Sequence, residues 1–283
     1  MRFPTSHTPI SQKILSDYRF RFFEHCIGAV DGTHIRVFSS NDKHVFMRNH
    51  KGFLSQNCLF ICDFDFDFIY SLCGWDGSVA DAALWKDAVE NDIEVPAGKY
   101  LLGDAGFASC DALLVPYHGV RYHLKEWCQG GIGYVESFSM LCIDLSNSGC
   151  SPRNSRELFN LRHAALRNII EHIFGVLKRQ WRILNNPPEY SMDIQARLPA
   201  GLCALHNFIN HFDPDAFYHP DFDADDLMRR FDEPDIPTDG GDDEHVPDGN
   251  ETERAGLRRN AIAQAMWDDY LAECTQRGIP LPT

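Results

Sequence analysis

Short apolar runs alternate with longer amphipathic stretches over residues 1–212. Apolar runs bounded by turn residues predict strands. We expect strands within Cys26–Phe38, Leu54–Trp75 and Tyr100–Asp104. The first of these is interrupted by the polar pair Asp31-Gly32.

Helical spacing of apolar residues predicts the covering elements. The longest helix should extend from about Ser155 to Leu184, because Pro187-Pro188 cannot continue it. Leu198–Phe212 predicts another helix, and Asp81 suits the N-cap of a helix over Ala82–Val89. Strands and helices mixed in this order indicate an α/β fold, a sheet with helices packed on it.

The segment Leu54–Trp75 allows two interpretations. Its two apolar runs flank Asp63–Asp67, which reads DFDFD. Strict alternation would fit one long strand with three aspartates on the solvent face. A hairpin that turns at the aspartates fits equally well, and short strands are commoner.

Composition changes sharply near residue 213. The stretch 213–253 holds sixteen Asp and Glu against two Arg, so its net charge is -14. Self-repulsion and few apolar groups predict a disordered linker. Helical character returns in 254–283, where the apolar residues form a stripe. We therefore expect one globular domain over 1–212, an acidic disordered linker over 213–253, and a terminal helix within 254–283. This helix either docks a partner or packs back on the domain.

Composition excludes several classes of protein. Of 283 residues, 44% are hydrophobic, which is enough for a core. The net charge of -15 resides almost wholly in the linker, because the rest of the chain is near -1. The ten cysteines form no CxxC pair, which indicates reduced thiols in the cytosol or nucleus rather than a disulfide framework. The chain begins with no apolar signal core, so we do not expect a secreted protein.

Three acids stand apart from their apolar surroundings: Asp31 within a strand, Asp104 at the end of another, and Glu171 inside a helix. Such acids cost desolvation unless they are paired or bound to metal. If they converge, they form an all-oxygen site of the kind that Mg²⁺ or Mn²⁺ prefers, with room for two ions. The alternative is structural: the aspartates make turns with the glycines beside them, and Glu171 pairs with Arg167.

The helix around Glu171 is locally basic. Seven Lys and Arg against two Glu lie between Arg153 and Arg182, in an otherwise acidic chain. Cations on one face of this helix would suit phosphate contacts that position DNA. The candidates are Arg167, Lys178, Arg179 and Arg182. The alternative is an ordinary solvated face.

Four motifs together resemble the catalytic domain of PIF/Harbinger-type transposases. They are CIGAVDGTHI from Cys26, GWDGSVAD from Gly74, YLLGDAGF from Tyr100 and RNIIEHIFGVLK from Arg167. The resemblance covers about residues 20–212 and keeps the order of the family. It implies an RNase H-like mixed sheet flanked by helices and a DDE endonuclease with Asp31, Asp104 and Glu171 as catalytic metal ligands.

The resemblance also implies an activity and its surroundings. The family nicks DNA at transposon ends and then transfers the freed strand to target DNA. Its members commonly work in the nucleus with a separate Myb-like DNA-binding protein, and assembly into a homo-oligomer is left open. A domesticated nuclease derived from such an enzyme would keep the same chemistry.

Three departures bear on these expectations. Only thirty residues precede Asp31, so we expect the helix-turn-helix segment of the family to be absent. The second motif ends in Ala80-Asp81 rather than His-Asp, which leaves Asp81 as an accessory residue only. The stretch 129–150 lacks family character, and we interpret it as a retained intron or a lineage-specific loop.

Two rival functions remain open. A transposase-derived module without catalysis would keep the fold and bind DNA or protein. A metal phosphohydrolase acting on small substrates would need the acids but not the basic helix.

Overall fold

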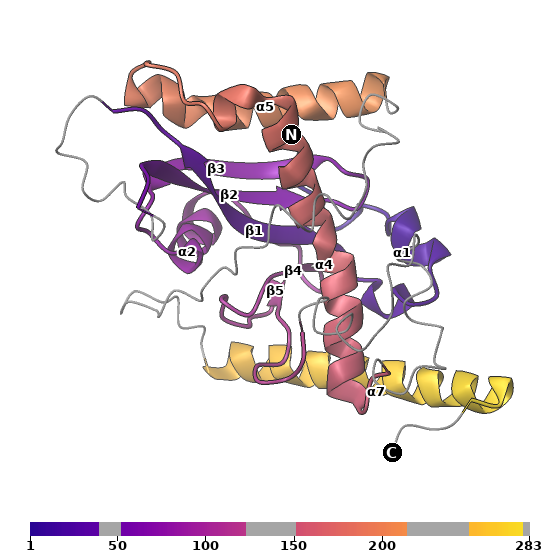
Figure 1. Cartoon of the computed structure of the whole chain (residues 1–283). Helices are drawn as coiled ribbons and strands as arrows, with labels where there is room; N and C mark the ends of the chain where they lie inside the picture. Colours follow the sequence, from indigo (N-terminus) through magenta and orange to yellow (C-terminus); the bar gives the residue numbers. More distant parts are fainter. Residues whose placement is uncertain (40–51, 123–150, 214–248, 280–283) are drawn as a thin grey trace.

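The computed structural model describes residues 1–39, 52–122, 151–213 and 249–279 (Figure 1). Five strands form one sheet in the order β3-β2-β1-β4-β5. Their bounds are β1 Cys26–Arg36, β2 Ser55–Cys62, β3 Phe68–Asp76, β4 Tyr100–Leu102 and β5 Leu113–Leu114. β1, β2 and β3 are antiparallel neighbours, whereas β4 runs parallel to β1 and β5 parallel to β4. The α/β, RNase H-like mixed sheet is thereby confirmed.

The acidic cluster is a turn, so the hairpin alternative is confirmed. Oδ1 of Asp63 accepts hydrogen bonds from the backbone N–H groups of Asp65 at 2.9 Å and Asp67 at 3.0 Å. Phe66 takes a left-handed conformation with φ of 69°, which reverses the chain between β2 and β3. Side-chain acceptance of turn N–H groups is the reason aspartate favours such positions.

Helices cover both faces of the sheet. α4, Ser155–Gln180, crosses one face and buries an apolar cluster that includes Phe60, Phe159 and Ile170. α2, Asp81–Asn91, covers the other face with Leu84 and Trp85. Because successive strand residues point to opposite faces, each strand contributes to both clusters in alternation.

The remaining long helices cover the two edges of the sheet. α5, Met192–Phe212, lies along β3, and the side-chain amide of Asn207 forms two hydrogen bonds with the backbone of Phe68. α7, Gly249–Arg277, lies on the β5 side. Its Arg258 and Arg259 donate to carbonyl oxygens on both sides of β5. Edge strands present unpaired backbone groups, and α7 lies beside this edge with its arginines bound to the residues just before and just after β5.

The N-terminal segment lies near α7. α1, Gln12–Ser16, is followed by a short 3-10 helix, η1, Arg21–Phe23. Ile14 and Phe23 are fully buried in the same cluster as Phe159. This segment therefore belongs to the folded body.

Several helix boundaries differ from the predictions. α4 ends at Gln180, and a 3-10 helix, η3, Arg182–Leu184, follows it. α5 begins at Met192 and contains Pro199 within it, and α7 begins at Gly249. Asp81 is the first residue of α2 rather than its N-cap, which is Ala80.

Two further predictions concern the terminal helix and the segments around it. α7 packs back on the body, because its Met266, Tyr270 and Cys274 are buried in the cluster under α4. The interpretations of 129–150 and of most of the acidic linker fall on 123–150 and 214–248, which lie outside the described residues.

Among the described helices, none is long and apolar enough to cross a membrane. The seven cysteines in the described ranges are free thiols.

Candidate active site

Asp31 lies on β1, and Asp104 follows β4, the parallel neighbour of β1. Ala29 of β1 pairs with Leu102, the last residue of β4; Asp31 lies two residues further along β1, and Asp104 lies two residues beyond the end of β4. Residues two apart share a face, and adjacent strands are about 4.8 Å apart. Ala29 and Leu102 both belong to the cluster under α4. The two carboxylates are close enough for their charges to interact. The turns named as the structural alternative are also present, because Oδ1 of Asp31 accepts from the N–H of Gly32 at 3.1 Å and Oδ1 of Asp104 accepts from the N–H of Gly106 at 2.8 Å.

Glu171 approaches Asp31 from α4, and Arg167 joins the two. Nη2 of Arg167 lies 2.6 Å from Oδ2 of Asp31, and Nη1 lies 3.0 Å from Oε1 of Glu171. The side chains of Arg167 and Asp31 are 7% and 14% exposed, whereas that of Glu171 is 47% exposed. The predicted alternative, an ion pair between Glu171 and Arg167, is thus present, and the same guanidinium neutralises Asp31.

Burial and charge act together on Asp31. Burial raises the pKa of Asp31 well above its usual range; Arg167 lowers that pKa, but the carboxylates of Asp104, Asp81 and Glu171 raise it again. Burial opposes the charge on Arg167, but the carboxylates of Asp31 and Glu171 raise the pKa of this guanidinium. The site is a partly buried acidic cluster with one cation inside it.

Tyr122 belongs to the same cluster and was missed by the sequence analysis. Burial raises the pKa of Tyr122 to about 12; Arg167 counteracts that rise, and the nearby carboxylates of Asp104 and Glu171 add to it. In the sequence, Tyr122 reads as one apolar position in a short run, with no spacing that links it to the acids. Only the tertiary fold brings it to them.

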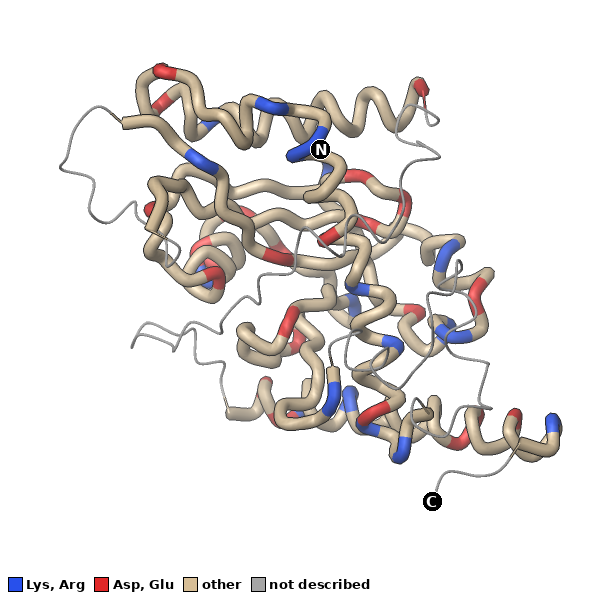
Figure 2. Tube along the Cα trace, viewed as in Figure 1, with Lys and Arg blue, Asp and Glu red and all other residues tan. Residues whose placement is uncertain are grey.

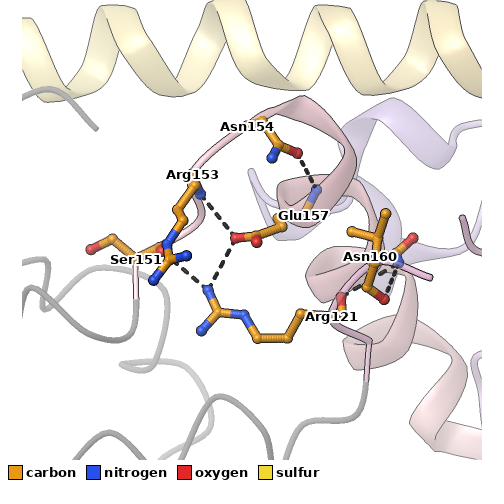
Figure 3. Close-up of polar contacts among 7 residues, drawn as sticks. Arg121, Ser151, Arg153, Asn154, Glu157 and Asn160 are labelled. Atoms are coloured by element: carbon orange, nitrogen blue, oxygen red, sulfur yellow. Dashed lines mark hydrogen bonds and ion pairs between the residues drawn. The ribbon is translucent and has the colours of Figure 1, made fainter. Parts of the chain in front are cut away.

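A polar network fixes the chain beside Tyr122 (Figure 3). Nη2 of Arg121 lies 3.1 Å from Oε2 of Glu157 and donates to the carbonyl oxygen of Ser151 at 3.2 Å. Asn154 caps α4 by accepting from the N–H of Glu157 at 3.0 Å. Asn160 binds backbone groups of the segment before Tyr122. The network joins both ends of the connection 123–150 to the first turns of α4.

Asp81 lies on the opposite face of the sheet from Asp31. A Cβ on Gly32 would come within 2.0 Å of the Asp81 carboxylate, so only glycine admits this approach. Gly32 follows Asp31 on β1 and therefore faces the α2 side. Oδ1 of Asp81 accepts a hydrogen bond from Asn57 at 2.6 Å. Asp81 can act on Asp31 through its charge but does not share its face.

The four basic residues predicted to contact DNA differ in their exposure. Arg167 is buried against Asp31, so it does not lie on an exposed cationic face as predicted. Lys178 donates from Nζ to Oγ1 of Thr33 on β1 at 2.6 Å. Arg179, near the C-terminal end of α4, and Arg182, the first residue of η3, are exposed. The apolar side of α4 is wider than the sequence pattern suggested, since β1 and α7 both pack on it.

Charges elsewhere are mixed. Lys and Arg positions are interspersed with Asp and Glu along the described trace (Figure 2). A phosphate-binding surface would therefore have to come from a local group such as the end of α4 rather than from a uniformly basic face.

Asp31, Asp104 and Glu171 have the ligand atoms that a divalent cation prefers, but their arrangement does not form a metal site. Among the described residues, no three Asp, Glu, His or Cys side chains are gathered closely enough to hold a metal ion. The donors are nevertheless all oxygen, which suits Mg²⁺ or Mn²⁺. Arg167 occupies the space between Asp31 and Glu171 that such a cation would share. The guanidinium supplies the positive charge that the carboxylates need in this arrangement.

Comparison with known proteins agrees with the motifs. A family model described as "DDE superfamily endonuclease" matches residues 30–207. The "Putative nuclease HARBI1" of Homo sapiens is 25% identical over 213 residues, covering 73% of this chain and 52% of the human protein. The protein of the same name from Rattus norvegicus is 27% identical over 187 residues, covering 64% and 45%.

A plant protein is similar as well. The "Protein ALP1-like" of Arabidopsis thaliana is 28% identical over 208 residues, covering 65% of this chain and 43% of that protein. The chain spans about half the length of the curated relatives it matches. No solved structure gives a significant match.

Proposed function

Because the chain belongs to the DDE superfamily endonucleases, we propose that it is a divalent-metal-dependent DNA nuclease, either a transposase or a domesticated nuclease derived from one. In the first form it cleaves phosphodiesters at transposon ends and transfers strands. The observation that supports the proposal is the interaction of the Asp104 and Glu171 carboxylates, from the end of β4 and from α4, with Asp31 on β1.

Asp31, Asp104 and Glu171 would hold the metal. A bound Mg²⁺ or Mn²⁺, or a pair of these ions, supplies Lewis-acid activation of water and phosphate. Metal binding would require Arg167 to move away from Asp31 and Glu171. Its guanidinium would then be able to bind a phosphate oxygen. Arg179, Arg182 and Lys178 position the DNA backbone near the acids. Under this proposal the protein works in the nucleus with a Myb-like DNA-binding partner.

One observation favours a second candidate, a transposase-derived binding module without catalysis. Arg167 already pairs with Asp31 and Glu171, and no three candidate ligands gather within the described ranges. A chain that keeps this ion pair in the presence of metal would bind DNA or protein without cutting it.

Calorimetric titration with Mn²⁺ separates the two candidates. The wild-type chain should bind Mn²⁺, and Asp104→Asn should lose most of that affinity. Asp87→Asn is the matched control, because Asp87 is an acid of α2, on the other side of the sheet, and its amide oxygen could still accept from Asn91. Equal binding by wild type and Asp104→Asn would refute the metal site and leave the binding module.

DNA binding is tested separately at the end of α4. Arg179→Glu with Arg182→Glu should weaken binding of duplex DNA and reduce its dependence on salt. The control is Arg277→Glu, since Arg277 is also exposed but lies at the end of α7, paired with Glu273. If the α4 variant loses DNA binding yet hydrolyses a small phosphodiester at the wild-type rate, the metal site serves DNA. If wild-type chain hydrolyses only the small substrate and binds no DNA, the protein is a small-molecule phosphohydrolase instead.

A further inference from the structure

α5 exposes an apolar stripe along its whole length. The side away from the sheet includes Leu205, Phe208 and Phe212, which are 40%, 58% and 68% exposed. The opposite side of α5 packs against the rest of the protein, and its Cys203 and His206 are fully buried. Figure 1 shows α5 at the periphery, with no described element on its far side. Single exposed apolar residues are ordinary, but a continuous stripe of this kind marks an interaction surface.

The stripe has the spacing of a coiled-coil seam. Its positions recur at alternating intervals of four and three residues, which keeps them on one line of a two-helix contact. They are Ile194, Leu198, Gly201, Leu205, Phe208 and Phe212. A helix that only covers a sheet needs this spacing on its inner side alone, so a second seam on the outer side calls for a second partner.

The seam is symmetric about Cys203. An antiparallel copy of the same helix would place Gly201 opposite Leu205 and Leu198 opposite Phe208. The smallest residue then faces a large one, and the outermost Phe212 faces Ile194. A two-fold contact uses the same patch on both molecules, and this patch is self-complementary under that operation.

The charges allow such a contact. None of the seam positions is charged, so pairing would bury no charge. Arg197 lies beside the seam near its start and can extend to solvent, as long cationic side chains do at such flanking positions.

The exposed apolar area is near what a specific dimer needs. From the exposed fractions of its members, the seam presents roughly 400–500 Å² per molecule. Two copies would bury roughly 800–1,000 Å², which is less than a standard interface and falls in the range of weak, transient ones. A micromolar dimer is the expected strength for such a contact.

We propose that α5 pairs antiparallel with α5 of a second copy of this chain, joining the two sheets at their β3 sides. None of the seam residues belongs to the proposed metal site or to the basic residues of α4 and η3, so the inference is independent of the proposed nuclease activity.

Sedimentation velocity of the full chain tests the proposal over about 1–100 µM protein. The wild-type chain should pass from monomer to dimer in this range. Phe208→Asp should remain monomeric, with the dissociation constant raised at least about 30-fold. Leu257→Asp is the matched control, because Leu257 is 63% exposed on α7, outside the seam, and its substitution should leave the dimer intact. Circular dichroism confirms that each variant is folded.

Two outcomes overturn the proposal. A wild-type chain that is monomeric throughout the range would mean that the stripe takes another occupant or none. A Phe208→Asp chain that dimerises like wild type would place the contact elsewhere. The register is tested by mixing Gly201→Cys with Leu205→Cys chains: a mixed disulfide supports antiparallel pairing, and a disulfide of Leu205→Cys with itself refutes it.

Discussion

Replacing Arg167 by Met should destabilise the protein far more than its single ion pair with Glu171 would suggest. The substitution keeps the apolar stem and removes the guanidinium that lies between Asp31 and Glu171. Asp31 would then carry a buried negative charge near Asp104 and Asp81, without a compensating cation. An uncompensated buried charge is among the costliest defects in a folded protein.

The two ion pairs of Arg167, with Asp31 and with Glu171, differ in strength because their carboxylates differ in exposure to solvent. The pair between Arg167 and Asp31 is nearly buried, and breaking such a pair costs about 3–5 kcal/mol. The Glu171 side chain is 47% exposed, and solvent-screened pairs contribute less than about 1 kcal/mol. Arg167→Met should therefore lower the free energy of unfolding by about 3–5 kcal/mol, whereas Glu171→Gln should lower it by less than about 1 kcal/mol.

Urea unfolding at neutral pH measures both variants, and Asp31→Asn in the Arg167→Met chain completes a double-mutant cycle. Neutralising Asp31 should recover part of the loss. The pKa of Asp31 is already raised in the wild-type fold, and losing the cation raises it further. A raised folded-state pKa stabilises the protein at low pH, so Arg167→Met should regain stability as the pH falls from 7 towards 4. A cost no larger than that of Glu171→Gln, or no recovery with Asp31→Asn, would refute the reasoning.

Three further predictions concern stability. His163 is buried, and burial lowers its pKa to about 3. Acidification below the ordinary pKa of histidine should therefore lower the free energy of unfolding by up to about 1.4 kcal/mol per pH unit. His163→Gln should flatten that slope in urea unfolding measured at several pH values. Gly28→Ala would press its Cβ within 2.2 Å of a backbone oxygen of β2 and should cost more than about 2 kcal/mol, while Gly256→Ala in open space on α7 should be stabilising in the same thermal melts. Asn207→Ala should cost about 2 kcal/mol, since both hydrogen bonds to the edge strand are lost; an unchanged urea midpoint would contradict the role given to that edge contact.

The sequence predicted the parts of the fold that local pattern controls. Strand and helix periods located the main elements, and the charges of the two acids that broke the apolar pattern, Asp31 and Asp104, interact. Exposure of a helical cation could not be predicted in the same way. Arg167 and Lys178 look alike by spacing, and the partner of each is distant along the chain, 136 residues away for Arg167 and 145 for Lys178. The fold decides which of them is buried.

Other features had no local signal. Tyr122 lies near the acids, and the residues just before it are bound by Asn160 and Glu157 of α4. Asp81 looked like a capping residue, but the missing side chain of Gly32 lets its carboxylate lie against β1. The sequence also left open whether the terminal helix docks elsewhere. Apolar spacing shows that a helix has a buried side, but it does not show which surface buries it.

The covered edges of the sheet have a consequence for how this chain would fail. A strand with open backbone groups can recruit another strand and seed aggregation. The arginines of α7 engage carbonyl groups on both sides of the short strand β5, and its apolar side seals the core beneath α4. A message truncated after residue 248 would therefore produce more than a shortened protein. It would uncover the β5 edge and the core beneath α4 together, and that product should precipitate or be degraded rather than persist as a smaller folded protein.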